Sequence, residues 1–195
     1  MYATIAPVDG FDQLATAAAE VDALARLRAA TGGPDGPMER HCLRVRHIAA
    51  ELAGRRGWAI DPEVLTVACI LHDIGLYPAA TRGGVYTSDG AALARELLPA
   101  YGWSEERVER CAQAIDRHHE LRSQLERGGE VEAVRVADLV DVSGGLLRFG
   151  VSRPWLKSLN AAVPRDGLAA ELAREVGRAL RERPLTMPRI FLRPS

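Results

Sequence analysis

The sequence is poor in several residue types, and each shortage excludes a class of protein. Lys157 is the only lysine, and the 25 basic side chains are balanced by 26 acidic ones, giving a formal net charge of -1 at pH 7. A chain without a global basic field does not attract a nucleic-acid backbone, so we expect no nucleic-acid partner. No apolar run approaches the ~20 residues that cross a bilayer, so we also expect no membrane association.

Cysteine is equally scarce. Cys42, Cys69 and Cys111 are too few and too widely spaced for a disulfide framework or a zinc knuckle. Their neighbours are apolar or helix-forming, so we expect each to be a small buried hydrophobic side chain in the reduced state. The first ten residues, MYATIAPVDG, lack the basic and apolar regions of a signal peptide, which favours a cytoplasmic location.

The chain does contain enough apolar material for one core, with 47% hydrophobic residues among 195. Helical periodicity recurs between Gly and Pro breaks, and strand alternation and internal repeats are absent. We therefore predict an all-α fold, a single-domain bundle of about six to eight helices. Residues 37–148 are expected to form its core. Residues 1–36 supply a helix and linker packed on that core, and residues 149–195 supply an irregular segment, a helix and a tail.

The periodicity places the helices within narrow limits. Asp61 and Ser104 are expected N-caps, and Ser88 or Asp89 is expected to cap the helix that follows the loop at 77–87. Helices are predicted over residues 11–30, 37–54, 62–71, 88–101, 104–119, 131–147 and 166–182. The remaining stretch, 149–164, is expected to be irregular and either to wall a pocket or to form a contact in a homo-oligomer.

Five histidines are few enough to interpret one by one. His72 is followed at once by Asp73 at the end of a strongly apolar helix, where two polar groups are costly without a reason. Imidazole and carboxylate together form the mixed N and O donor set suited to Mn, Fe, Co, Ni or Zn. The alternative is that both residues merely cap the helix end.

Two further positions repeat this pattern. His41 shares the inward stripe of its helix with Arg44 and Ile48, and Asp138 lies in the apolar sequence VRVADLVDVS. His47 is six residues after His41 and far round the helix, so we expect it to be solvated and to have no role.

The order His, His-Asp, Asp in ERHCLRVRHIA, LHDIG and VADLVD resembles the HD-domain superfamily of metal-dependent enzymes. The resemblance covers about residues 37–145. It implies these metal ligands: His41, His72, Asp73 and Asp138. Members with two metal ions usually add histidines from two separated positions before the final Asp, and residues 74–117 contain none. One divalent ion, Mn, Fe, Co, Ni or Zn, is therefore expected.

A metal held by imidazoles and carboxylates lowers the pKa of water and so produces a hydroxide nucleophile. We expect a hydrolase that acts on a small molecule, a phosphate ester or nucleotide-like substrate. Asp73, from the resemblance, orients the water. Candidate proton donors are His118, His119 and Asp141. The plainer alternatives are surface histidines at a helix end and, for Asp141, a salt bridge with Arg44 or Arg135.

Substrate-binding candidates are scarce. Arg44, Arg82 and Arg117 are the cations that suggest themselves for a phosphate. Ser88 and Asp89, at an expected helix N-terminus, are candidates to hold a phosphate or amide with help from backbone amides. Ordinary loop and N-cap contacts are the alternative for each.

A second resemblance supports a different reaction. The segment VYTSDGAALARELLPAYGW resembles the Asp-Gly-Ala segment of the cyanamide-hydratase-like branch, whose members add water to a small nitrile with a bound zinc. A hydratase is therefore the alternative to a phosphohydrolase. A diiron oxygenase and a non-catalytic binding module are less favoured, the former because the intervening histidines are missing.

Overall fold

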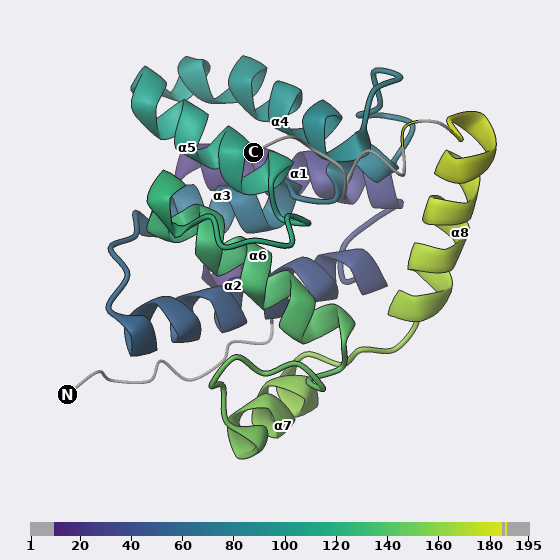
Figure 1. The fold of residues 1–195 in the computed structure, drawn as a ribbon. Coiled ribbons are helices and arrows are strands. Elements are labelled where there is room, and N and C mark those ends of the chain that lie inside the picture. Colours follow the sequence, from purple (N-terminus) through teal and green to yellow (C-terminus); the bar gives the residue numbers. More distant parts are fainter. Residues whose placement is uncertain (1–9, 185, 187–195) are drawn as a thin grey trace.

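The computed structural model describes residues 10–184 and 186, and this part of the chain contains eight α-helices and no strand (Figure 1). They are α1 (Ala18–Thr31), α2 (Pro37–Arg56), α3 (Pro62–Leu71), α4 (Tyr86–Leu97), α5 (Glu105–Asp116), α6 (Gly129–Val142), α7 (Arg153–Ala162) and α8 (Leu168–Glu182). Short 3-10 helices lie at Phe11–Gln13 (η1), Ile74–Leu76 (η2), Leu98–Tyr101 (η3) and Leu125–Arg127 (η4). The predicted all-α class is confirmed.

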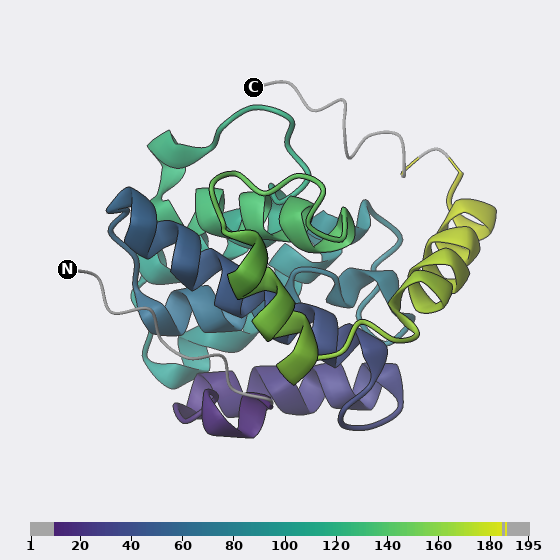
Figure 2. The same cartoon turned by 90° about the horizontal axis from the view of Figure 1, so that it is seen from below.

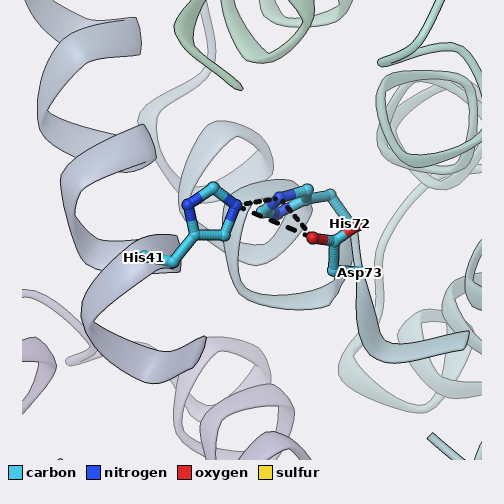
Figure 3. Close-up of side chains that lie close together, drawn as sticks. All are labelled: His41, His72 and Asp73. Atoms are coloured by element: carbon cyan, nitrogen blue, oxygen red, sulfur yellow. Dashed lines mark hydrogen bonds and ion pairs between the residues drawn. The ribbon is translucent and has the colours of Figure 1, made fainter. Parts of the chain in front are cut away.

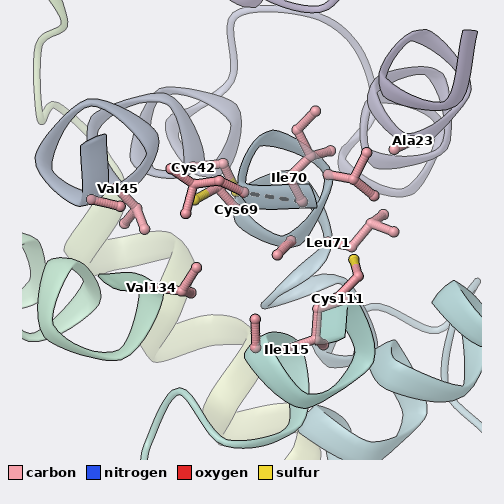
Figure 4. Packing of buried hydrophobic residues seen from close by; sticks show 14 of the residues in the cluster. Ala23, Cys42, Val45, Cys69, Ile70, Leu71, Cys111, Ile115 and Val134 are labelled. Carbon is pink, nitrogen blue, oxygen red and sulfur yellow. Dashed lines mark hydrogen bonds between the residues drawn. The ribbon is translucent and has the colours of Figure 1, made fainter. Parts of the chain in front are cut away.

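Helix α3 forms the centre of the bundle. Its residues from Val64 to Leu71 are all buried, and the helix contacts α1, α2, α5 and α6. Figure 4 shows side chains from these four helices packed around Ile70 and Leu71. The uniformly apolar sequence of α3 therefore reflects a helix enclosed on every side.

The three cysteines lie in this core as expected. Cys42, Cys69 and Cys111 are buried and form no disulfide. Burial raises the pKa of the Cys69 thiol to about 12, and it raises the pKa values of the other two thiols as well. They are packing residues and not reactive thiolates.

Two helix pairs flank α3 (Figure 1). Helix α2 packs along α6, and α4 packs against α5. The approach of α4 requires a glycine after α3, because a Cβ at Gly75 would lie 2.0 Å from the carbonyl oxygen of Tyr86. The absence of a side chain at Gly75 thus brings the start of α4 to the end of α3.

Local signals located two helix starts correctly. The Asp61 carboxylate accepts hydrogen bonds from the amides of Glu63 and Val64, at 3.0 and 3.2 Å. The Ser104 hydroxyl accepts one from the amide of Arg107 at 3.4 Å. Both are the predicted N-caps of their helices, because a cap depends on residues only two or three positions away.

Other helix boundaries differ from the prediction. Helix α1 begins at Ala18 and not at Phe11, because the Glu20 carboxylate caps it by accepting hydrogen bonds from the amides of Thr16 and Ala17, both at 2.9 Å. Helix α6 ends at Val142 and not at residue 147, since the glycines that follow adopt positive φ angles of 64° and 79°.

The start of α4 is a further correction. The helix begins at Tyr86 with Val85 as its N-cap, so Ser88 and Asp89 lie inside its first turn and neither is a cap. The Asp89 carboxylate instead turns back, accepting hydrogen bonds from the Thr81 hydroxyl at 3.1 Å and the Arg82 amide at 2.9 Å. It organises the preceding loop.

The irregular stretch predicted at 149–164 is wrong, because α7 occupies most of it. The Ser152 hydroxyl caps this helix by accepting a hydrogen bond from the Trp155 amide at 3.3 Å, and Pro154 lies in its first turn. A serine followed closely by proline is a helix-start signal that the sequence carried. Helix α8 follows, and Figures 1 and 2 both place it at the edge of the bundle, against α2 and η2. No helix in the described part of the chain is long and apolar enough to cross a membrane.

Candidate metal centre

His72 and Asp73 stand where α3 ends. His72 is the C-cap of the helix, and its Nδ1 lies 2.8 Å from the carbonyl oxygen of Cys69, three residues earlier. A carbonyl oxygen only accepts, so Nδ1 carries the hydrogen and Nε2 presents its lone pair. The end of the helix therefore sets the tautomer of His72 as well as its orientation.

His118 repeats the same arrangement at the end of another helix. Helix α5 ends at Asp116, not at His119 as predicted, and the Nδ1 of His118 lies 2.7 Å from the carbonyl oxygen of Ile115. The imidazole thus satisfies a carbonyl that the helix end leaves without a partner. Its Nε2 also points away from its own helix, toward Asp73 Oδ1 at 3.4 Å.

His41 reaches the same place from α2. Its Nδ1 lies 2.7 Å from Asp141 Oδ2, so this nitrogen donates and Nε2 faces the end of α3. The Nε2 atoms of His41 and His72 are only 3.1 Å apart (Figure 3). Two lone pairs at this distance repel unless a proton or a cation lies between them, which is the first indication of a ligand.

Two carboxylates complete the cluster. Asp73 Oδ2 lies 3.6 Å from His41 Nε2 and 3.5 Å from His72 Nε2, and Asp138 Oδ1 lies 3.3 Å from His41 Nε2. Asp73 Oδ1 and Asp138 Oδ2 are buried and have no hydrogen-bond partner among the described residues. Buried carboxylate oxygens without a hydrogen bond are costly, and coordination to a cation removes that cost. The donor set therefore fits a divalent metal.

The electrostatics of the cluster also favour a cation. Burial alone would lower the pKa of His41, but the Asp138 and Asp141 carboxylates raise it to about 10. Burial alone would raise the pKa of Asp73, yet the adjacent imidazoles, that of His72 first, hold it well below its usual range. The carboxylates thus stay ionised in the interior and require positive charge nearby, which a proton on His41 or a metal ion supplies.

Histidine and carboxylate atoms form two overlapping groups with the spacing of metal ligands. One consists of His41, His72 and Asp73, and the other of Asp73, His118 and His119. Asp138 contacts both groups, at His41 and, more loosely, at His119 Nδ1, 3.8 Å away. All four residues predicted as ligands therefore lie in one cluster, and His118 and His119 lie in it as well.

Tyr86 is a member of the site that the sequence did not indicate. It is the first residue of α4 and is buried, and its hydroxyl contacts His119 Nε2 and lies 3.4 Å from His118 Nε2. The sequence placed Tyr86 in a loop, so no periodic signal pointed to it. Burial and the neighbouring His118 lower the pKa of His119 to about 4, which keeps its imidazole neutral at pH 7.

Asp141 does not line the cluster with Asp138. It lies behind His41, on the Nδ1 side, where Arg44 donates to it from Nε at 2.8 Å and from Nη2 at 2.9 Å. The fully buried Arg44 is therefore paired with this carboxylate. The salt bridge with Arg44, the alternative to proton donation for Asp141, is therefore present, and the same carboxylate accepts a hydrogen bond from the His41 imidazole.

The other substrate-binding candidates lie apart from the cluster's contacts. Arg82 is exposed and pairs with Glu96 through two 2.5 Å hydrogen bonds, and Arg117 pairs with Glu120 at 3.3 Å. Asp89 is engaged with its own loop, as described above. None of these three side chains forms a hydrogen bond or ion pair with a cluster residue in the described part of the chain.

His47 was expected to be solvated, and it is buried with 6% of its surface exposed. Helix α2 is packed by α3, α6, α7 and α8 around most of its circumference, so its far side is also covered. A helical wheel assumes one wet face, which this helix lacks.

Known proteins share the middle of this chain. The model of the HD domain family matches residues 38–143, just over half of the chain. Two curated relatives, the cyanamide hydratases DDI2 and DDI3 of Saccharomyces cerevisiae, are each 32% identical to it over 90 residues. That match covers 44% of this chain and only 40% of either relative.

A solved structure has a similar fold. It is described as a predicted HD superfamily hydrolase from an uncultured Thermotogales bacterium. The TM-score is 0.51 at 23% sequence identity, over 83% of this chain and 91% of that one. At this identity the likeness concerns the fold alone.

Proposed function

The chain belongs to the HD-domain family, and we propose that it is a metal-dependent enzyme that adds water to a small uncharged molecule. The observation that carries this proposal is the convergence of three imidazole Nε2 atoms on two buried carboxylates, two of whose oxygens have no hydrogen-bond partner among the described residues. Cyanamide-type and nitrile substrates are the first class to test, because the curated relatives are named cyanamide hydratases.

The metal would be held by His41, His72, Asp73 and Asp138. The Nε2 atoms of the two histidines lie 3.3 to 3.9 Å from the nearer oxygens of the two carboxylates. When bound, a divalent ion supplies Lewis acidity, lowering the pKa of water and polarising the bond under attack. Asp73 has a second oxygen that faces His118, so it is placed to orient the attacking water while it binds. We expect one ion, as the sequence suggested.

Tyr86 and His119 form the proton-handling edge of the site. The His119 side chain is 23% exposed, against 6% or less for the four proposed ligands, so substrate approaches from this side. Water addition to a C≡N carbon forms a C–O bond and breaks a C–N π bond, and the nitrogen takes up a proton. The neutral His119 and the Tyr86 phenol are positioned to relay that proton.

The charge of the surroundings favours an uncharged substrate. Each arginine considered for phosphate binding is paired with a carboxylate: Arg44 with Asp141 behind His41, Arg82 with the exposed Glu96, and Arg117 with the half-buried Glu120. Phosphate recognition ordinarily uses cations that are available to the ligand. A nitrile or cyanamide requires no such clamp.

Phosphate ester hydrolysis, the reaction predicted first from the sequence, is the second candidate. One observation favours it: Asp73, His118 and His119 form a second group with ligand spacing, and a second ion there would itself neutralise a phosphate. The two candidates therefore differ in the number of metal ions as well as in substrate.

One experiment separates them. The purified full-length chain is analysed for metal content and then assayed with cyanamide and small nitriles, and with a panel of phosphate esters under added Mn, Co, Ni or Zn. The proposal predicts one ion per chain and turnover of the uncharged class, lost in Asp138→Asn. Two ions with turnover of phosphate esters alone would support the second candidate, and a folded protein that binds no metal would overturn both.

A further inference from the structure

The carboxylate of Asp141 is fully engaged, although it is buried and touches no open part of the site. Oδ2 accepts from His41 Nδ1 at 2.7 Å and from Arg44 Nη2 at 2.9 Å. Oδ1 accepts from Arg44 Nε at 2.8 Å and from Arg165 Nη1 at 2.7 Å. Four hydrogen bonds from three side chains therefore hold the Asp141 carboxylate in a single orientation.

Arg165 comes from the connection between α7 and α8, outside the matched residues 38–143. The same connection is anchored to α2 by its main chain. The carbonyl oxygen of Pro164 accepts from Arg44 Nη1 at 2.8 Å and from Arg40 Nε at 3.2 Å, and that of Asp166 accepts from Arg40 Nη2 at 2.8 Å. Arg40 therefore holds the connection but forms no hydrogen bond or ion pair with Asp141.

We propose that Asp141 is a positioning residue for His41 and that the α7–α8 connection acts on the metal centre through Arg165. The inference rests on the proposed metal-binding function. A carboxylate that accepts the Nδ1 hydrogen fixes the imidazole tautomer and rotation, so that Nε2 is presented to the ion. Arg165 adds a second hydrogen bond to Oδ1, which Arg44 Nε would otherwise hold alone, and so reinforces the orientation of the carboxylate that accepts from His41.

This arrangement separates two possible reasons for the presence of Arg165. If Arg165 serves only to hold the α7–α8 connection in place, then replacing Arg40, which makes two hydrogen bonds to the same connection, must weaken metal binding as much as replacing Arg165 does. If it acts through Asp141, only the loss of Arg165 matters for the metal. The Arg165 side chain is 29% exposed, and Asp141 keeps its ion pair with the buried Arg44 when Arg165 is replaced, so the substitution does not leave an unpaired buried charge.

The test measures the affinity of the full-length chain for Co²⁺ and Zn²⁺ by competition with a chromophoric chelator. The visible absorption of the Co²⁺ form serves as a second readout, and far-UV circular dichroism as a check on folding. We expect Asp141→Asn to weaken binding by about 10- to 100-fold, and Arg165→Met by roughly tenfold, with an altered Co²⁺ spectrum. Arg165→Lys should restore most of the affinity, and Arg40→Met should leave affinity and spectrum unchanged.

Each outcome decides the question. Unchanged affinity in folded Arg165→Met, or an equal loss in Arg40→Met, would overturn the positioning role while leaving the metal function intact. If Asp141→Asn fails to fold, the Arg165 variants and the lysine rescue still decide. A wild-type chain that binds neither ion would overturn the proposed function, and this inference with it.

Discussion

Three histidines of the cluster are held in two different ways. His72 and His118 donate from Nδ1 to main-chain carbonyls three residues earlier, at the ends of α3 and α5. His41 donates to the side chain of Asp141, 100 residues away, which is fixed in turn by arginines from α2 and from the α7–α8 connection. The first device is local and the second depends on the whole bundle.

The difference predicts which substitutions should weaken metal binding at the proposed site. A main-chain carbonyl survives any side-chain replacement at its residue, so His72 and His118 are protected from most mutations nearby. His41 has no such protection, because its partner is a side chain whose own partners are side chains. The cluster thus contains two histidines, His72 and His118, that nearby substitutions should leave in place, and one, His41, whose position depends on other side chains.

Removing a locally held ligand tests the cluster itself and should have the largest effect. His72→Ala deletes an Nε2 donor that lies 3.1 Å from that of His41, and we expect bound metal and activity to fall below detection while the helix content stays normal. Metal analysis and circular dichroism check this. The matched control is His47→Gln, at a buried histidine outside the cluster, which should keep its metal and lose only about 1 kcal/mol of stability.

His119 is held in neither of these two ways, because its Nε2 contacts the hydroxyl of Tyr86. Tyr86→Phe should keep metal content and lower the rate with the uncharged substrate class by about 100-fold or more, the usual contribution of a positioned proton donor. Steady-state kinetics and metal analysis measure the two effects. An unchanged rate would remove Tyr86 from the proton relay.

Gly75→Ala tests the close approach of α4 to the end of α3, where His72 lies. Gly75→Ala places a Cβ 2.0 Å from the carbonyl oxygen of Tyr86, so α4 must shift from the end of α3. We expect a loss of about 1–3 kcal/mol in the free energy of unfolding by urea, together with weaker metal binding. Gly36→Ala is the control, because nothing lies within 4 Å of its Cβ. Alanine is a weaker N-cap than glycine, so this variant should lose about 1 kcal/mol of stability, but its metal binding should stay unchanged.

Replacing the side chain of Cys69 should have the smallest effect on metal binding, and it tests directly whether His72 depends only on a main-chain carbonyl. Cys69→Ala keeps the carbonyl that holds His72, so the affinity for Zn²⁺ should stay unchanged, although the cavity left in the core costs about 1–2 kcal/mol of stability. Chelator competition and urea unfolding measure both quantities. A loss of affinity comparable to that of Asp141→Asn would show that the two devices are equally fragile.

The sequence by itself determined the features that depend on neighbours along the chain. Helical periodicity established the all-α class, and Asp61 and Ser104 were recognisable caps because each satisfies amides two or three residues away. His72 and Asp73 were recognisable for a related reason. Two costly polar groups ended a helix that was otherwise wholly apolar.

The predictions were wrong or incomplete where the sequence pattern was weak, or where tertiary packing determined the burial and position of a residue. Helix α7 begins with a Ser152 cap inside a stretch predicted to be irregular, whereas the burial of His47 depends on how many helices surround α2. Tyr86 gave no signal, because its position at the cluster follows from the close approach that Gly75 allows.

Only the tertiary structure decided which charges meet. Arg44 and Arg165 are far apart in sequence, and both bind one carboxylate behind His41 rather than a substrate in front of it. A sequence lists charges without their distances, and the energy between charges depends on distance and burial. The sequence therefore identified the residues that we propose as metal ligands, and the packing of α2, α6 and the α7–α8 connection determines how one of them, His41, is held.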